Sequence, residues 1–97
     1  MKIIYVDIDE TICTSPQSRK YAAAIPIKEN IEKINKLYDR GNTIVYWTSR
    51  GSRKQINWYK LTKAQLKEWG AKYNELRVDK PYYDLFIDDK TLRIEEV

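Results

Sequence analysis

The chain has 97 residues, which fits one domain over residues 1–97 and leaves no room for a second. Its 18 lysines and arginines exceed its 14 aspartates and glutamates, so the formal net charge is +4. This mild excess suits an anionic ligand but falls short of a nucleic-acid-binding surface. The sequence contains no histidine, which excludes Ser-His-Asp and Cys-His catalytic sites. Any acid–base chemistry must therefore be performed by carboxylates or lysine.

The cysteine content and the N-terminal segment indicate the compartment. Cys13 is the single cysteine, so no intramolecular disulfide is possible. Asp7 interrupts the N-terminal apolar run after Val6, which is unlike a signal segment, and no apolar stretch is long enough to span a bilayer. We expect a cytoplasmic protein with no membrane partner. A lone thiol beside the apolar Ile12 is most simply a small buried hydrophobic group, and we assign it no chemistry.

Apolar runs and helical spacings alternate along the chain. We expect strands over 2–6 and 43–47 and short strands over 75–78 and 85–87. Between the first two strands we expect a helix that carries Ile31, Ile34, Leu37 and Tyr38 and ends at Gly41. After the second strand we expect a helical segment over 52–59 and then a helix that begins at Thr62, with the capping-box spacing of Thr62 and Gln65, and ends at Gly70.

This alternation predicts an α/β fold, a three-layer Rossmann-like parallel sheet with helices on both faces. Ligands of such sheets bind beyond the carboxyl ends of the strands, at a switch in strand order. Asp7, Thr48 and Asp88 each directly follow an expected strand. We therefore expect three polar clusters to meet in one crevice.

The acidic residues of this crevice need compensation. Asp7 and Asp9 lie two residues apart, and ionised carboxylates in a dry site repel unless a cation, a shared proton or a basic partner is present. Asp88 and Asp89 would bring the number of carboxylates to four. Mg²⁺ takes oxygen ligands and would offset this charge and create a place for a phosphate, which Lys80 would help to hold.

At this point a resemblance to a known family becomes informative. Asp7-x-Asp9-x-Thr11, the hydroxyl of Thr48, Lys80, and Asp88-Asp89 after the last apolar run resemble, in order, motifs one to four of the haloacid dehalogenase superfamily. The resemblance extends from the first expected strand to the last. It implies a Mg²⁺-dependent phosphatase that works through a phosphoaspartate. The insertions that form caps in this superfamily are missing, so the resemblance is to a capless member.

The resemblance also implies roles for the first motif. Asp7 would be the nucleophile and a metal ligand. Asp9 would protonate the leaving oxygen and later accept a proton from water, while its backbone carbonyl reaches the metal. Both roles require the chain to bend just after Asp7, because residues two apart on an extended segment point to the same side. Glu10 stands where many relatives have glycine, which could reshape this loop.

The other motifs receive their roles in the same way. Thr48 and the amide of Ser49 would bind phosphate oxygens, and Lys80 would offset charge on Asp7 and on the phosphoryl group. Asp89 would bind Mg²⁺ and Asp88 would be a supporting acceptor, although the two could exchange roles. Thr11 and Arg50 are further supporting candidates, the latter facing an anion, because a cation at a helix start is unfavourable on dipole grounds.

The substrate is less well defined. An open crevice admits a polynucleotide end or a phosphoprotein, or requires a second subunit to shield a small phosphorylated substrate. Short relatives occur among bacterial enzymes of capsule and surface-polysaccharide biosynthesis, so a sugar or polyol phosphate is our first hypothesis. Trp58, Tyr82 and Tyr83 follow the motifs and could stack on a substrate, although core packing is the simpler interpretation. A receiver-type signalling domain is a rival hypothesis, disfavoured by the order of the motifs.

Overall fold

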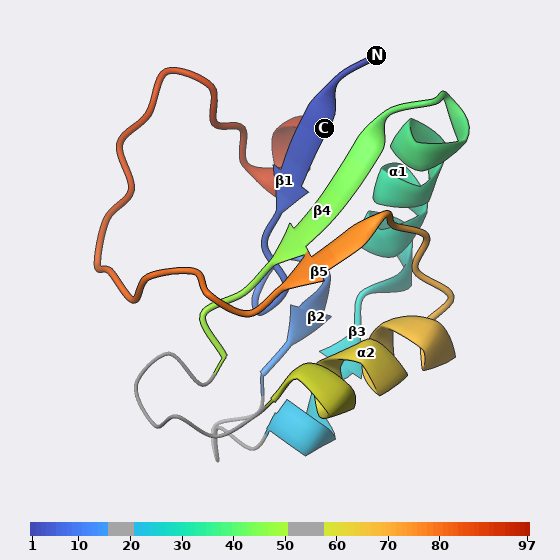
Figure 1. The fold of residues 1–97 in the computed structure, drawn as a ribbon, viewed down its shortest axis with the longest axis vertical. Helices are drawn as coiled ribbons and strands as arrows, with labels where there is room; N and C mark the ends of the chain where they lie inside the picture. Colours follow the sequence, from blue (N-terminus) through green and yellow to red (C-terminus); the bar gives the residue numbers. More distant parts are fainter. Residues whose placement is uncertain (16–20, 51–57) are drawn as a thin grey trace.

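The computed structural model describes residues 1–15, 21–50 and 58–97. Its centre is a three-stranded parallel sheet with the strand order β1-β4-β5 (Figure 1). The strands are β1 (Ile3–Val6), β4 (Thr43–Trp47) and β5 (Glu75–Arg77). The three strands predicted at these positions are confirmed to within one residue at each end.

Two α-helices connect these strands. Helix α1 (Lys28–Asp39) precedes β4, and α2 (Tyr59–Glu68) precedes β5. Each helix is followed by a glycine in the left-handed region, Gly41 at φ 96° and Gly70 at φ 74°. Glycine tolerates this conformation without a steric penalty, which confirms both predicted helix ends.

The segment between β1 and α1 contains small elements. These are β2 (Cys13–Thr14), the 3-10 helix η1 (Tyr21–Ala23) and β3 (Ile25–Pro26). Strands β2 and β3 pair antiparallel, and a second 3-10 helix, η2 (Ile94–Glu96), lies near the C-terminus. In the part of the chain that the structure describes, no helix is long and apolar enough to cross a membrane.

The core lies between the sheet and the two α-helices. It is formed mainly by Val6, Ile8, Ile12, Cys13, Ile31, Ile34, Ile44, Tyr46, Leu66 and Leu76. Because β1, β4 and β5 are consecutive in space and parallel, right-handed crossovers place α1 and α2 on the same face of the sheet (Figure 1). The other face leaves Ile3 72% and Tyr5 48% exposed. The expected helical layer on both faces is therefore not formed by the described residues.

The predicted strand over 85–87 is wrong. These residues belong to an irregular segment that bows away from the sheet, which we call the C-terminal arm (residues 78–93; Figure 1). Leu85 is 75% and Ile87 87% exposed, so neither packs into the core. A parallel crossover needs about a dozen residues or more, and only residues 78–84 separate the arm's apolar run from β5.

The predicted helix start at Thr62 is also wrong. Helix α2 begins at Tyr59, so Thr62 and Gln65 lie inside the helix and not at a capping box. Both side chains are buried and bind a residue from another element, as described below. The helical segment predicted over 52–59 lies largely outside the described residues.

Candidate active site

A tight turn follows β1 and separates the two acidic side chains of the first motif. The carbonyl of Ile8 accepts hydrogen bonds from the amides of Thr11 (3.1 Å) and Ile12 (2.9 Å). The chain therefore bends directly after Asp7, and the bend predicted from the sequence is present. Glu10 adopts a left-handed conformation at φ 64°, which costs a non-glycine residue about 1 kcal/mol. Its carboxylate accepts the amide of Ser15 at 2.8 Å and so ties this turn to the end of β2.

Asp7 lies beside Lys80. The ammonium nitrogen of Lys80 is 3.4 Å from Oδ1 of Asp7, and the hydroxyl of Thr11 donates to Oδ2 at 3.3 Å. The Asp7 side chain remains 38% exposed, yet burial by the surrounding protein raises the pKa of its carboxyl group, while the charge of Lys80 opposes this shift. Asp7 is thus a partly desolvated carboxylate with one cation beside it, at the rim of the sheet.

The backbone of Lys80 is placed by β4. Its amide donates to the carbonyl of Thr48 at 3.1 Å, and the amide of Thr48 donates to the carbonyl of Arg77 at 2.9 Å. These bonds continue the β4–β5 pairing beyond the ends of the strands. The sheet thereby brings Asp7, Thr11, Thr48 and Lys80 to its carboxyl edge, as the sequence predicts for these four residues.

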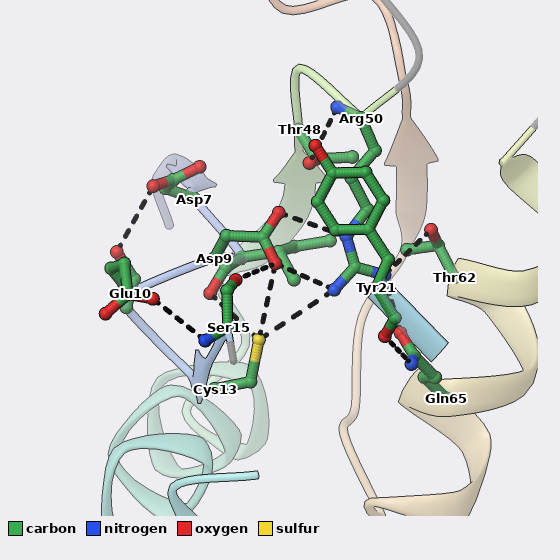
Figure 2. A network of polar contacts seen from close by, with 12 residues as sticks. Asp7, Asp9, Glu10, Cys13, Ser15, Tyr21, Thr48, Arg50, Thr62 and Gln65 are labelled. Atoms are coloured by element: carbon green, nitrogen blue, oxygen red, sulfur yellow. Dashed lines mark hydrogen bonds and ion pairs between the residues drawn. The ribbon is translucent and has the colours of Figure 1, made fainter. Parts of the chain in front are cut away.

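Asp9 points to the other side of the turn and pairs with Arg50 (Figure 2). The guanidinium donates from Nη2 to Oδ1 at 2.8 Å and from Nε to Oδ2 at 3.0 Å. The hydroxyl of Ser15 donates to the same Oδ1 at 3.2 Å. Such a bidentate pair between a guanidinium and a carboxylate fixes the orientation of both planar groups. Asp9 is therefore held by a cation of its own and does not share Lys80 with Asp7.

The Arg50 side chain has no exposed surface and is enclosed by three further residues (Figure 2). Nη1 donates to the hydroxyl of Thr62 at 3.2 Å and to the side-chain oxygen of Gln65. The guanidinium carbon lies 4.8 Å from the ring centre of Tyr21, a cation–π distance. Gln65 also donates to the carbonyl of Tyr21 at 2.6 Å. The buried charge is thus compensated by Asp9 and solvated by polar groups from α2 and η1.

These contacts change the interpretation of Arg50. The sequence suggests a cation facing a bound anion, whereas the side chain points inward, to Asp9. Thr62 and Gln65 were not predicted as members of the site. Residues three apart on a helix lie on the same face, so the spacing that resembles a capping box also fits two side chains that contact one partner. Their polarity was a signal for a buried partner.

Thr48 is buried and its hydroxyl accepts the amide of Arg50 at 3.2 Å. The hydroxyl hydrogen can still be donated, because a threonine side chain is both donor and acceptor. Ser49 is half-buried beside it. The turn after β4 thus presents one available donor near the carboxyl edge of the sheet.

Asp88 and Asp89 are not brought to Asp7. Both are exposed on the C-terminal arm, where the carboxylate of Asp88 accepts the amide of Asp89 at 2.7 Å. Among the described residues, no group of three or more potential ligand residues is arranged to hold a metal ion. Asp7 lies at the carboxyl edge of the sheet, whereas Asp89, the other carboxylate predicted to bind Mg²⁺, is exposed on the arm. The predicted carboxylate ligands of Mg²⁺ are therefore not brought together among the described residues of one chain.

An open cavity of about 1640 Å³ lies beside Asp7, between β1 and the C-terminal arm. Aromatic rings stand around its cationic end: Nζ of Lys80 is 5.6 Å from the ring centre of Trp47 and 5.3 Å from that of Tyr83. Phe86 lines the same cavity and lies 5.4 Å from Tyr83, measured between ring centres. A phosphate near Lys80 would therefore have aromatic surfaces beside it.

The other two aromatic candidates lie in different surroundings. Trp58 packs edge-on against Tyr21, with 5.2 Å between the ring centres. Tyr82 is 57% exposed on the arm. Tyr83, the third aromatic residue proposed from the sequence, is in contact with Lys80 of the Asp7 site.

Comparison with known proteins gives one structural likeness. No known protein family matches the sequence, and neither does any curated protein. A crystal structure of a target protein from Vibrio cholerae is similar to this chain, with a TM-score of 0.89 and 27% sequence identity. The match covers 99% of this chain and 86% of that protein, which carries no functional name. The likeness supports the small α/β fold with its parallel sheet.

Proposed function

We propose that the chain is a capless phosphomonoester hydrolase of the haloacid dehalogenase type, with Asp7 as the nucleophile. The observation that carries this proposal is the position of Asp7: it directly follows the first strand of a parallel sheet, lines an open cavity and has Lys80 at 3.4 Å. Carboxylates act as nucleophiles in phosphoryl transfer, and a cation beside the attacking oxygen stabilises the charge that gathers on the phosphoryl group.

The reaction proceeds in two displacements. An oxygen of Asp7 forms a bond to phosphorus while the bond to the leaving oxygen breaks, and that oxygen takes a proton from Asp9. Water then attacks the phosphorus of the aspartyl phosphate, returns a proton to Asp9 and releases inorganic phosphate and the Asp7 carboxylate. Lys80 and the Thr48 hydroxyl hold phosphoryl oxygens in both steps.

The pair of Asp9 and Arg50 sets a condition on this scheme. Both carboxylate oxygens of Asp9 accept hydrogen bonds from the guanidinium. Each carboxylate oxygen has two lone pairs, so Oδ2, which accepts from Nε of Arg50, can carry the transferable proton on its other lone pair, whereas Oδ1 already accepts from Arg50 and Ser15. Arg50 is thus a positioning residue for Asp9 in this proposal.

Mg²⁺ is the cofactor in this proposal, and Asp7 and the backbone carbonyl of Asp9 would bind it. The described residues of one chain bring Asp7 to the carboxyl edge of the sheet and leave Asp88 and Asp89 exposed on the arm. When bound, the ion would offset the negative charge of Asp7 and of the phosphoryl group.

A sugar or polyol phosphate is the first substrate class. A polynucleotide end or a phosphoprotein is the second candidate, because the cavity beside Asp7 is open and an open site admits a bulky substrate. A panel of phosphorylated sugars, phosphopeptides and 3′- or 5′-phosphorylated oligonucleotides would rank these classes by kcat/KM. A receiver-like phosphoacceptor would instead retain its phosphate without turnover.

The central experiment is hydrolysis of p-nitrophenyl phosphate with Mg²⁺. We expect turnover by the wild-type protein and a loss of at least about 1,000-fold in Asp7→Asn, since removal of a catalytic nucleophile costs several orders of magnitude. Asp39→Asn is the matched control, because Asp39 is an exposed residue paired with Lys72. Undiminished turnover in Asp7→Asn would falsify the proposal. If turnover persists with a chelator present, the reaction does not require Mg²⁺, and that part of the proposal is wrong.

A further inference from the structure

The C-terminal arm exposes a continuous apolar run. Leu85 is 75%, Phe86 44% and Ile87 87% exposed. Three consecutive apolar residues in solvent are unfavourable in an isolated domain, and such surfaces usually mark a contact with another molecule. The similarity to the Vibrio cholerae structure covers 99% of this chain, so the arm lies within the matched range.

The sheet offers a partner for this run. β1 lies at the end of the strand order, so one of its edges has no neighbouring strand among the described residues. An unpaired edge presents backbone donors and acceptors to any extended segment that can pair with it. Ile3 and Tyr5 of β1 are exposed, and β1 and Phe86 of the arm line the same cavity of about 1640 Å³.

The arm of the same chain is poorly suited to fill this edge. Residues 78–84 would have to carry the chain back across the sheet to begin a parallel strand, and this is shorter than the dozen or so residues that such a connection needs. The far end of the arm is fixed as well: Ile94 packs on the core, and its carbonyl accepts the ammonium of Lys33 at 3.4 Å. The arm is thus anchored to its own chain at both ends, and too few residues follow β5 for residues 85–87 to form a parallel strand on their own β1.

We propose that two copies of this chain exchange their arms, so that residues 85–87 of one copy pair in parallel with β1 of the other. The exchange places Asp88 and Asp89 of one copy beside Asp7 of its partner, and each active site then contains residues of both chains. The role of the acidic pair rests on the proposed function; the exchange of strands does not. Swapping identical segments about a two-fold axis is a common route to dimers.

This arrangement fixes a register. If Asp88 lies beside Asp7 of the partner copy in a parallel pairing, Phe86 lies beside Tyr5, since both pairs differ by the same number of positions. The exposed apolar run then covers the unpaired edge of β1 and places the Phe86 ring beside that of Tyr5. The acidic pair then reaches the carboxyl edge of the sheet beside Asp7, which is itself predicted to bind Mg²⁺.

Mass measurement by light scattering is the first test. We expect a species of twice the 11.6 kDa of one chain, and a shift to the single-chain mass in Ile87→Asp, which puts a charge into the paired strand. Lys60→Asp on the exposed face of α2 is the control and should leave the dimer intact. A wild-type protein that is monomeric at micromolar concentration overturns the exchange.

A disulfide tests the register without any activity. Tyr5→Cys and Phe86→Cys chains, one of them carrying a mass tag, are mixed after mild unfolding, refolded together and oxidised. We expect a cross-link between one chain of each kind, whereas each variant alone should give little. The native Cys13 is buried and does not interfere. A dimer without the mixed cross-link contradicts the proposed pairing.

Activity of mixed variants tests the shared site. Asp7→Asn and Asp89→Asn are each expected to be inactive, but an equal mixture refolded together should recover about one quarter of the wild-type rate, because half of the dimers contain one intact site of two. A mixture of Asp7→Asn with the double variant should stay inactive. If the wild-type protein is active but the mixture of the two single variants is inactive, the shared site is refuted. An inactive wild-type protein instead refutes the proposed function, and the mass and cross-link still decide the exchange.

Discussion

Arg50 and its contacts Asp9, Tyr21, Thr62 and Gln65 form what we call the Arg50 network. This network and the C-terminal arm both contain acidic residues that the sequence assigns to one site, but the carboxylates of the two regions have different partners. Asp9 is bound at two oxygens by a fully buried guanidinium that contacts residues of η1 and α2. The carboxylate of Asp88 accepts the amide of its neighbour Asp89, and both residues are exposed. An acidic motif is assembled where packed elements supply its partners, and residues 81–93 of the arm are exposed in one chain.

The largest effect should come from breaking the Arg50 network. Arg50→Met leaves Asp9 without its cation, and removing one member of a buried ion pair costs about 3–5 kcal/mol of unfolding free energy. Urea denaturation measures this loss. Lys72→Met, which removes an exposed pair with Asp39, should cost less than about 1 kcal/mol. Equal losses in the two variants would mean that the burial of Arg50 contributes nothing. Adding Asp9→Asn to Arg50→Met should recover part of the stability.

A smaller loss of unfolding free energy is expected when a residue that binds the Arg50 guanidinium is replaced. Gln65→Leu removes the acceptor of Nη1 and the donor to the Tyr21 carbonyl, and an unsatisfied buried group costs about 1–3 kcal/mol. Lys67→Leu on the exposed side of α2 is the control and should stay within about 0.5 kcal/mol of wild type. An unchanged urea midpoint in Gln65→Leu would show that Thr62 alone suffices to support Arg50.

The third predicted effect is a pH dependence of stability that comes from Cys13, which lies beside Asp9 and Arg50. Burial raises the pKa of its thiol to about 12. The unfolded thiol ionises at lower pH while the folded thiol stays neutral, so stability is full below about pH 8.5 and falls between about pH 9 and 12. The slope approaches 1.4 kcal/mol per pH unit. Urea titrations at pH 8, 9 and 10 should show a steeper decline for wild type than for Cys13→Ala; parallel declines would contradict a buried neutral thiol.

The smallest effect should come from the arm. At concentrations where the chain is monomeric, Leu85→Ser removes little buried surface, because Leu85 is 75% exposed, and should change the unfolding free energy by less than about 0.5 kcal/mol. Leu66→Ala in the core should cost about 2–5 kcal/mol. If Leu85→Ser were as costly as Leu66→Ala, the arm would be packed within one chain, and the contrast between the two regions would disappear.

The strands and helices that pack against one another were predictable from the sequence. Gly41 and Gly70 end their helices, and the run over 43–47 is buried at its centre, because these signals are local and agree with the packing. The run over 85–87 has the same apolar character, yet it forms no strand. Strand formation requires a neighbouring strand, and no local pattern reveals whether one is within reach.

The candidate site was predictable where it depends on strand ends and not where it depends on burial. Asp7 and Lys80 follow β1 and β5 closely, so the parallel sheet brings them together. Arg50 also follows a strand, but arginine is usually exposed, and its inward direction is set by Asp9, Thr62 and Gln65 from distant parts of the chain. A sequence read locally cannot supply such a set of partners.

The enclosure of Arg50 has a consequence for how the chain folds. Its partners come from the turn after β1, from η1 and from α2, so the charge can leave water without a large penalty only when all three segments have arrived. A half-formed intermediate with this charge inside would be too high in energy to accumulate. The network therefore makes docking of the two halves of the chain cooperative, and a single unfolding transition should be seen by tryptophan fluorescence and by circular dichroism alike.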